Sequence, residues 1–522
     1  MSDAAQPTLG FWKIAQESPD RLAVVDPDGT ETTYGEVLAM ANQIVHGLRS
    51  LGLEKGDGVA VVLANGLPMI ASFMAAAQAG WYITPINHHL VGPEIAFIVN
   101  DCEAKVFIGD ERYADACANA AKELSLPATH LLSVGTVPGF RPIEEVIADQ
   151  PTSMPENRTM GQAMHYTSGT TGKPKGVRRK LNDVDPDVAA PFTGFLLNLF
   201  GIPPYEDNVH ICGSPLYHTA VLAFAGSSLN VGHPVVLMDK WTPEGMLQLI
   251  ERHKVTQSHM VPTQFHRLLA LPDEVKDKYD VSSLRTMIHA AAPCPIDVKQ
   301  RMLEWWGPVI YEYYAATEGG GTLVTPEQWL KKPGTVGTPW PNSEIRILDD
   351  DGKDVPTGST GTVYMKLPEA AGFEYFKDKN KTEENRREGF FTVGDIGYLD
   401  EDGYLFLCDR KSDMIISGGV NIYPAEIEGV LLSHPKVGDA AVFGIPHPDW
   451  GEEIKAVIEP EVGNEPSDAL TDEILAFAQE RLAKFKIPKS IDYTNEMPRD
   501  PNGKLYKRKL RDPYWEGRDR AI

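Results

Sequence analysis

The chain contains 522 residues, of which 42% are hydrophobic and 23% are charged, as in ordinary globular proteins. This length exceeds what a single hydrophobic core usually supports, so we expect two or more domains. The formal net charge of −24 argues against a nucleic acid as a partner, because binding to a phosphate backbone requires clustered cations.

The N-terminal residues and the cysteines predict where the protein resides. Residues 1–16 contain no apolar stretch of the signal-peptide kind, and no segment reaches the roughly 18 apolar residues of a transmembrane helix. The five cysteines lack Cys-x-x-Cys spacing, which favours reduced thiols over a zinc site or a disulfide framework. The sequence therefore predicts a cytoplasmic protein with no transmembrane segment.

Short β-rich runs alternate with longer helical runs between about residues 20 and 310. The run 59–63 precedes a helical stretch over 68–79, and the run 235–238 precedes another over 243–253. Such alternation is typical of α/β layers in which the strands are largely parallel.

The pattern changes between about residues 335 and 410. Short apolar runs are separated there by Asp-Gly pairs at 351–352 and 402–403. Asp-Gly between two apolar runs is a strong signal for a β-hairpin, so we expect antiparallel strands in this stretch.

A compact unit of roughly 110 residues follows Arg410. We expect a helix over 424–432 and strands near Ala440 and Ala456. A further amphipathic helix is expected, because apolar residues recur at helical spacing at Ile474, Phe477, Ala478 and Leu482.

Residues 166–177 are rich in glycine, hydroxyl groups and lysine, with the sequence Tyr-Thr-Ser-Gly-Thr-Thr-Gly-Lys-Pro-Lys-Gly-Val. Glycines let backbone N–H groups turn toward an anion, and Lys173 and Lys175 add positive charge. The Walker pattern is excluded, because only two residues separate Gly169 from Gly172. The run therefore predicts a phosphate-binding loop of another class.

This loop resembles that of the adenylate-forming (ANL) superfamily, which includes acyl-CoA synthetases, amino-acid adenylation domains and beetle luciferases. Further segments match motifs of this family in the same order: Tyr314-Ala-Ala-Thr-Glu318, Thr392-Val-Gly-Asp395, Asp409-Arg410, Ser417 to Pro424, and Pro501-Asn-Gly-Lys504. The matches cover nearly the whole chain. The sequence is most similar to the acyl-CoA synthetase or fatty-acid–CoA ligase branch.

The resemblance implies an α/β fold with a large N-terminal body of α/β subdomains plus a small β-barrel, and a smaller, mobile α+β C-terminal domain. We expect the body, which binds the nucleotide and the acyl group, over residues 1–409 and the C-terminal lid over residues 412–522. The hinge is expected near Ser412, where family members usually carry Asp or Lys. A serine removes that charge without blocking backbone rotation.

The resemblance also implies an ATP site. Asp395 would accept both ribose hydroxyls, supported by Arg410. Adenine would lie against a wall of small residues with a tyrosine stacked on it, formed by Ala291, Ala292, Pro293 and either Tyr313 or Tyr314. The β- and γ-phosphates would be bound by Thr167, Ser168, Gly169, Thr170, Thr171, Gly172, Lys173 and Lys175.

Four residues are the catalytic candidates that the resemblance implies. Glu318, next to Thr317, would be a ligand of the catalytic Mg²⁺, a cation that prefers oxygen ligands. Lys504 would bridge the substrate carboxylate and the α-phosphate and stabilise the negative charge that grows in the transition state. His218 lies where the family places an aromatic residue at the mouth of the acyl pocket.

The expected acyl pocket is formed by His218, Phe265, Ala315, Gly319 and Gly320. Three consecutive glycines begin at Gly319, and we expect their missing side chains to leave room along the pocket. No acidic residue lies within 215–220, although an α-amino acid substrate would need a buried carboxylate for its ammonium group. We therefore expect a medium-to-long-chain or bulky hydrophobic or aromatic carboxylic acid.

A CoA site is also implied. Gly418 and Gly419 resemble lid glycines that leave a slot for the pantetheine arm of CoA. Trp450 and Phe485 are candidate contacts for the adenine and the phosphates of CoA. Three cations follow the phosphate loop, and we expect them to be solvated, with CoA phosphates as the alternative: Arg178, Arg179 and Lys180.

The predicted activity is that of an ATP- and Mg²⁺-dependent acid–CoA ligase, which forms an acyl-adenylate and then a thioester with CoA. One alternative is an adenylate-forming enzyme that passes the acyl group to a carrier protein. Another is a catalytically silent protein that binds nucleotide or acyl groups. The sequence leaves the oligomeric state open, with a homodimer as one alternative.

Overall fold

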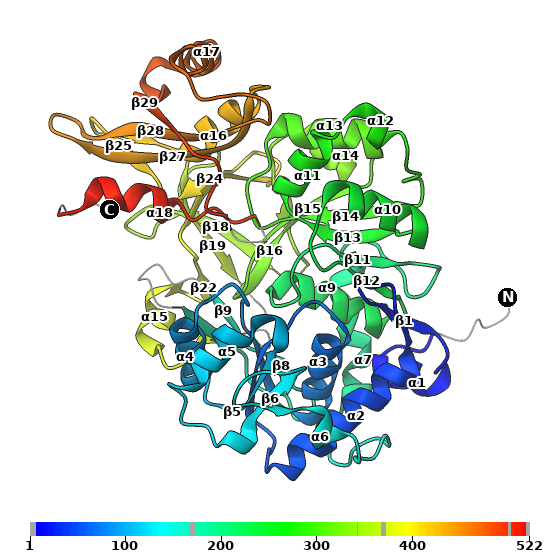
Figure 1. Cartoon of the computed structure of the whole chain (residues 1–522). Helices are drawn as coiled ribbons and strands as arrows, with labels where there is room; N and C mark the ends of the chain where they lie inside the picture. The colour runs from blue at the N-terminus through cyan, green and yellow to red at the C-terminus, as the bar shows by residue number, and fades with distance from the viewer. Residues whose placement is uncertain (1–6, 168–173, 342, 367–371, 500–502, 518–522) are drawn as a thin grey trace.

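The computed structural model describes residues 7–167, 174–341, 343–366, 372–499 and 503–517. These residues form five sheets, four in a large N-terminal body and one in a smaller C-terminal unit (Figure 1). The predicted class, a mixed α/β fold with a large body and a small C-terminal domain, is confirmed.

One sheet of the body has six strands that are parallel throughout, in the order β7-β6-β5-β3-β4-β8. β3 is buried at every position, as expected for a parallel strand whose two faces are covered. The helix predicted after β3 is present as α3. The elements of this layer are β3 (Gly58–Val62), α3 (Leu67–Ala79), β4 (Tyr82–Pro85), α4 (Gly92–Asp101), β5 (Ala104–Asp110), α5 (Ala114–Ala121), β6 (Leu131–Val134), β7 (Arg141–Pro142), α6 (Glu144–Ile147) and β8 (Gln162–Ala163).

The second sheet has nine strands in the order β17-β16-β15-β14-β13-β11-β12-β1-β2. Its central strands are parallel, and the edge strands β2, β16 and β17 are antiparallel to their neighbours. The strands are β1 (Leu22–Val25), β2 (Glu31–Thr33), β11 (His210–Cys212), β12 (Val235–Leu237), β13 (Gln257–Met260), β14 (Thr286–His289), β15 (Ile310–Ala316), β16 (Gly319–Val324) and β17 (Thr338–Pro339).

Among the described residues, ten helices lie in the parts of the chain that contribute to this sheet. Thr33 caps α2 in a capping box with Glu36, and Thr242 caps α10, which spans the residues predicted for it. The helices are α1 (Phe11–Glu17), α2 (Tyr34–Ser50), α7 (Pro186–Thr193), α8 (Phe195–Asn198), α9 (Thr219–Asn230), α10 (Pro243–His253), α11 (Pro262–Leu269), α12 (Asp273–Lys276), α13 (Ile296–Trp306) and α14 (Pro326–Lys331).

The stretch predicted as hairpins forms a third, antiparallel sheet. Gly352 and Gly403 adopt φ values of +81° and +79°, as Asp-Gly turns require. Among the described residues its strand order is an open path, β21-β22-β19-β23-β24, with β18 paired to β19. The elements are β18 (Glu344–Leu348), β19 (Gly361–Lys366), α15 (Lys379–Glu384), β21 (Arg386–Arg387), β22 (Phe390–Phe391), β23 (Asp395–Leu399) and β24 (Leu405–Arg410).

A three-stranded sheet joins distant parts of the body. β9 (His165–Thr167) and β10 (Lys175–Arg178) flank the phosphate loop, and β20 (Glu374–Tyr375) pairs with β10. This pairing places residues near 375 beside the loop, from which they are about 200 positions distant in the sequence.

The C-terminal unit, which we call the lid, lies at one end of the molecule (Figure 1). Ser412, the expected hinge, is exposed in a turn between β24 and β25. The helices predicted over 424–432 and around Ile474 are present. The lid consists of β25 (Ile415–Ser417), β26 (Val420–Ile422), α16 (Pro424–Leu432), β27 (Val437–His447), β28 (Gly451–Pro460), α17 (Asp468–Gln479), β29 (Ser490–Tyr493) and α18 (Lys507–Arg511).

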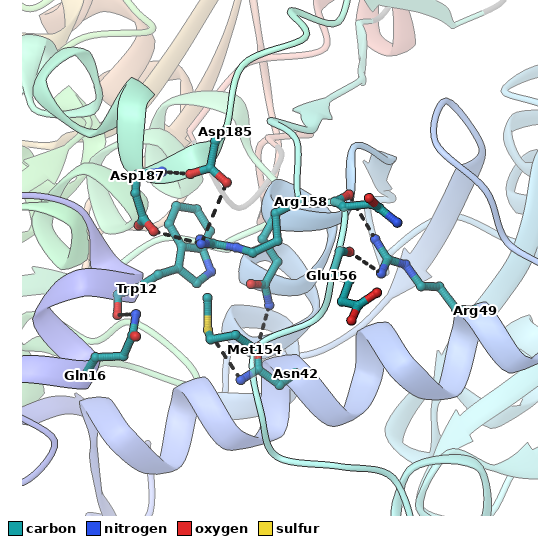
Figure 2. Close-up of polar contacts among 11 residues, drawn as sticks. Trp12, Gln16, Asn42, Arg49, Met154, Glu156, Arg158, Asp185 and Asp187 are labelled. Atoms are coloured by element: carbon teal, nitrogen blue, oxygen red, sulfur yellow. Dashed lines mark hydrogen bonds and ion pairs between the residues drawn. The ribbon is translucent and has the colours of Figure 1, made fainter.

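A segment ahead of the phosphate loop is tied to three helices (Figure 2). Arg158 donates to Asp187 at the start of α7 over 2.8 Å, and its guanidinium lies 5.4 Å from the ring centroid of Trp12 in α1. Arg49 of α2 donates to the carbonyl oxygen of Glu156 over 2.7 Å. These contacts join the segment ahead of the loop to α1, α2 and α7.

Among the residues described, no helix is both long and apolar enough to span a membrane. The five cysteines are free, and three of them, Cys102, Cys117 and Cys212, are buried.

The core below β15 contains a buried ion pair. Lys299 Nζ lies 2.6 Å from Glu312 Oε2, and Lys299 is fully buried. Burial alone would raise the pKa of Glu312, but Lys299 and His289 together outweigh it and lower this pKa to about 2. We expect Lys299→Met to lower the free energy of unfolding by about 3–5 kcal/mol, because Glu312 then stays buried without its ammonium partner.

Urea unfolding of this variant tests the expectation. The double variant Lys299→Met/Glu312→Leu should recover most of the loss, because it removes both charges. The depressed carboxyl pKa stabilises the fold above the usual carboxyl range, and this contribution is lost as the pH falls toward about 2. The difference between Lys299→Met and the unaltered protein should therefore shrink with falling pH, and a difference that stays constant would contradict the assignment.

Candidate functional site

The predicted site residues gather at one edge of the nine-stranded sheet. β13, β14 and β15 are adjacent and parallel, so their carboxyl ends meet at the same edge. The segments 261–265, 290–293 and 317–318 follow these three strand ends directly. Such an edge is where α/β sheets bind their ligands.

The phosphate loop leaves the three-stranded sheet at Thr167 and returns to it at Lys175. These two residues pair across β9 and β10, and Lys175 forms an ion pair with Asp378. The pairing fixes both ends of the loop. The other predicted loop residues, Ser168, Gly169, Thr170, Thr171, Gly172 and Lys173, lie outside the described residues.

Glu318 is buried in the turn between β15 and β16. The hydroxyl of Tyr375 donates to its Oε1 over 2.7 Å. Arg179 donates to the carbonyl oxygens of Thr317 and Glu318 over 2.8 and 3.1 Å. The carboxylate is thus held by one side chain and its backbone by another, although no sequence motif marked either Tyr375 or Arg179.

The expectation that the three cations after the loop are solvated is wrong for two of them. Arg178 lies between two aromatic rings, 4.2 Å from the centroid of Tyr82 and 4.6 Å from that of Phe376. Arg179 is committed to the carbonyls of Thr317 and Glu318. Only Lys180 is exposed, as predicted.

Asp395, Arg410 and Tyr314 come together from three strands. Asp395 begins β23, Arg410 ends β24, and the two pair in register with Arg410 Nε 3.4 Å from Asp395 Oδ1. The hydroxyl of Tyr314 donates to Asp395 Oδ2 over 2.6 Å. Burial raises the pKa of Asp395, while the charge of Arg410 and the Tyr314 hydroxyl oppose that rise.

Tyr313 points to the opposite side of β15 from Tyr314, as strand alternation requires. Its ring lies in a buried aromatic cluster with Phe224 and His259, and its hydroxyl is 3.1 Å from His259 Nε2. Of the two tyrosines considered for adenine stacking, Tyr314 is therefore the one beside the expected ribose site.

The predicted adenine wall follows β14. Ala291 adopts a φ of +74°, a left-handed conformation that costs a residue with a Cβ about 1–2 kcal/mol. Backbone strain of this kind is found at ligand sites. Ala292 and Pro293 line a cavity of about 80 Å³ between the body and the lid.

The chain next to Lys504 meets the body at Thr263, where a Cβ on Gly503 would lie 2.5 Å from Thr263 Oγ1. Burial, with a smaller contribution from the charge of Lys504, lowers the pKa of His218 to about 4. The imidazole is therefore neutral near pH 7. Its Nδ1 has no hydrogen-bond partner among the described residues, and His218 stands at the N-terminus of α9.

The expected acyl-pocket residues are less open than the sequence suggested. Phe265 is fully buried in the core, where its ring packs edge-on against His289 and Trp306. Ala315, Gly319 and Gly320 lie in the hairpin of β15 and β16.

The expectation that the glycines leave room along the acyl pocket does not hold at the third glycine, Gly321. A Cβ on Gly321 would lie 2.2 Å from the carbonyl oxygen of Tyr314 and 3.0 Å from the Trp340 ring. Glycine is needed at this position because the backbone of β15 and the indole already occupy the space.

The predicted CoA residues lie on the surface of the lid. Gly418 and Gly419 adopt φ values of +57° and +79°, and a Cβ on either would meet nothing within 4 Å. The N–H of Gly418 donates to the carbonyl oxygen of Trp450 over 2.9 Å. Trp450 and Phe485 are both about half exposed, so neither is a core aromatic residue.

Glu318 is the residue that could hold Mg²⁺. Among the parts of the chain that the structure describes, no three His, Cys, Asp or Glu side chains converge on a common point. Mg²⁺ beside a nucleotide is usually bound through one or two carboxylates together with substrate phosphates, so a single oriented carboxylate fits this ion.

Known proteins are similar to this chain over nearly its whole length. A family model described as AMP-binding enzyme matches residues 11–372, and one described as AMP-binding enzyme C-terminal domain matches residues 426–504. A feruloyl-CoA synthase from Amycolatopsis sp is 33% identical over 511 residues, which cover 96% of this chain and 98% of that protein.

Two further similarities bear on the acyl group and its acceptor. The fatty acid–[acyl-carrier-protein] ligase ScoC from Streptomyces coeruleorubidus is 29% identical over 517 residues, covering 97% of this chain and 96% of that protein. The crystal structure of the anthranilate CoA ligase AuaEII in complex with anthranoyl-AMP matches with a TM-score of 0.84 at 26% identity, covering 98% of this chain and 99% of that one.

The Tyr314 hydroxyl supports the charged form of Asp395, so its removal should raise the pKa of this carboxyl further. We expect Tyr314→Phe to weaken ATP binding by roughly 3- to 10-fold, the effect of one hydrogen bond. The loss should grow as the pH falls, because the variant loses the Asp395 carboxylate at a higher pH than the unaltered protein does.

Titration calorimetry with ATP between about pH 5 and 8 measures both effects. Tyr398→Phe is the matched control, since Tyr398 lies in the same strand as Asp395 but its ring stacks on Phe406. Equal ATP affinity of Tyr314→Phe and Tyr398→Phe at every pH would refute the assignment of Asp395 to the ribose.

Proposed function

Because the chain belongs to the family of AMP-binding, adenylate-forming enzymes, in its acyl-CoA synthetase branch, we propose that it is an acid–CoA ligase for a medium-to-long-chain or bulky hydrophobic or aromatic carboxylic acid. In the first step a carboxylate oxygen of the acid attacks the α-phosphorus of ATP, and the bond to pyrophosphate breaks. In the second step the CoA thiolate attacks the acyl carbon, and the bond to AMP breaks. The reaction takes place in the cytoplasm.

The observation that supports this proposal most is the position of Lys504. Its charge lies close enough to His218 to lower the pKa of that imidazole, and Gly503 packs against Thr263 of the body. The lid lysine is therefore at the carboxyl edge of the nine-stranded sheet, which is where the adenylate would form.

Three sets of residues would bind the ribose and the phosphates of ATP. Asp395, supported by Tyr314 and Arg410, would accept the ribose hydroxyls. The loop from Thr167 to Lys175 would bind the β- and γ-phosphates. Lys504 would stabilise the negative charge that develops between the carboxylate and the α-phosphate, a contribution that is largest where water is excluded.

Glu318 would hold the Mg²⁺ ion, with its carboxylate oriented by Tyr375. When bound, the ion supplies positive charge that offsets the charge of the phosphates. The hydrogen bond from Tyr375 would orient the carboxylate of Glu318 toward the ion.

The second step would use another face of the lid. Gly418 and Gly419 lie in an open turn next to Trp450, so a rotation near Ser412 would bring a surface without side chains to the adenylate. A hinge-type motion of this kind lets one site perform two reactions in sequence.

The acid class is supported by the residues near His218. A neutral imidazole offers no negative charge to an ammonium group, and the neighbouring side chains Phe224, His259 and Tyr313 form an aromatic cluster. The similar proteins named for feruloyl and anthraniloyl groups act on aromatic acids, which agrees with this choice.

A carrier protein is the alternative acceptor of the acyl group, and the similarity to ScoC supports this alternative. Acid-dependent release of pyrophosphate that CoA does not accelerate would support that alternative. A silent binding protein would release no pyrophosphate with any acid, although Lys504, Glu318 and Asp395 argue against it.

The test is AMP release from purified protein with ATP and Mg²⁺, measured with and without CoA. The acids are short, medium, long and aromatic. We expect CoA-dependent AMP formation with one class of the larger acids. A higher kcat/KM for acetate than for all larger acids would overturn the proposed acid class.

Lys504→Ala should lower the rate of adenylate formation by roughly 100-fold or more, the usual effect of removing a charge that stabilises a transition state. Thioester formation from supplied acyl-AMP should remain close to the unaltered rate, because that step does not place Lys504 in the site. Acid-dependent exchange of pyrophosphate into ATP and thioester assays measure the two steps separately.

Lys509→Ala is the control for this variant, since Lys509 is exposed in the same basic segment and its Nζ lies 5.3 Å from the ring centroid of Tyr506. We expect both steps to proceed normally in this control. An equal loss of both steps in Lys504→Ala would contradict the two-position use of the lid.

A further inference from the structure

Arg499 lies in the lid where the chain approaches Lys504. Arg499 and Leu505 pair as an antiparallel bridge, and of the residues between them the structure describes Gly503 and Lys504. The Nη1 of Arg499 donates to the carbonyl oxygen of Gly503 over 2.6 Å. This bond fixes the backbone immediately ahead of the lysine.

The guanidinium of Arg499 is itself held by Asp439 of β27. Nε and Nη2 donate to the two carboxylate oxygens of Asp439 over 2.5 and 2.7 Å, a forked arrangement that lysine could not form. The two side chains are only 16% and 14% exposed. Burial opposes the charge of Arg499, but its bonds to Asp439 outweigh that effect, so the pKa of the guanidinium is raised.

Gly503 connects this pair to the body. Its φ is +78°, and a Cβ at this position would lie 2.5 Å from Thr263 Oγ1 and 3.3 Å from Val261 Cγ2. The bond from Arg499 therefore acts on a backbone segment that is pressed against the segment following β13. The next residue is Lys504, whose charge acts on His218.

Arg499 makes these three bonds to lid residues alone. A cavity of about 80 Å³ lies between the pair and the body, lined on the body side by Thr263, His266 and Arg267. The three bonds of Arg499 therefore lie within the lid and do not depend on a partner in the body.

We propose that Arg499 and Asp439 are a positioning pair for the adenylation step, which hold Gly503 and Lys504 in the conformation that reaches the acid and the α-phosphate. The inference rests on the proposed function for its role in catalysis. Neither residue touches a substrate, and the thioester step, in which Lys504 has left the site, does not need the pair.

Arg499→Met tests this directly. We expect it to lower acid-dependent exchange of pyrophosphate into ATP by roughly 10- to 100-fold, because small displacements of a catalytic group have effects of this size. Thioester formation from supplied acyl-AMP should stay close to the unaltered rate. A variant whose lid merely folded badly would lose both steps together.

Lys455→Met is the matched control. Lys455 is a buried lid residue paired with Asp492 over 2.5 Å, on strands away from Lys504. Its loss should lower the unfolding temperature about as much as the loss of Arg499, without separating the two steps.

Two more variants distinguish positioning from charge alone. Arg499→Lys should recover only part of the exchange rate, because one ammonium group cannot reproduce the fork that reaches both Asp439 and Gly503. Asp439→Asn should impair the same step, and the double variant Arg499→Met/Asp439→Asn should be no slower than Arg499→Met, since both act through one contact.

Hydrogen exchange of the peptide covering residues 503–506 gives a readout that requires no activity. It should become faster in Arg499→Met and stay unchanged in Lys455→Met. Unchanged exchange in Arg499→Met, or an equal loss of both chemical steps, would overturn the positioning role. Absence of acid-dependent exchange in the unaltered protein would instead refute the proposed function, and hydrogen exchange would still decide whether the pair holds Gly503 and Lys504.

Discussion

The carboxyl ends of three adjacent parallel strands are the constraint on which the site depends. Because β13, β14 and β15 run in the same direction, the loops that follow them must share one edge of the sheet. Other elements approach that edge: Tyr375 from the three-stranded sheet, Asp395 and Arg410 from the antiparallel sheet, and the segment of Gly503 and Lys504 from the lid. Each of these groups lies on a separate element, so one of them can move or be substituted while β13, β14 and β15 keep their arrangement.

The sequence could predict the residues that touch a ligand better than those that hold them. Chemistry restricts the former, and a short run such as that around Thr317 and Glu318 becomes recognisable when several such motifs occur in the same order. Tyr375 orients Glu318 only because β20 pairs with β10, a contact between segments about 200 residues apart. Such pairing depends on the whole sheet and leaves no local pattern.

The two predictions that the structure corrects, on the cations after the loop and on the glycines after Glu318, failed for the same physical reason. Arg178 and Arg179 look like a solvated basic run, yet they lie against aromatic rings and carbonyls supplied by distant strands. The glycines after Glu318 look like open space, yet at Gly321 the indole of Trp340 fills it. In each case the sequence shows which side chain is present, and the fold decides what occupies the space around it.

The ion pair between Lys175 and Asp378 bears on how tightly the nucleotide can be held. The lysine at the end of the phosphate loop has an anionic partner in Asp378. If this loop binds the β- and γ-phosphates as proposed, an incoming phosphate would replace a carboxylate rather than only water, and that carboxylate would replace the departing pyrophosphate in turn. Such an internal competitor would lower the affinity for the nucleotide and help to expel the product.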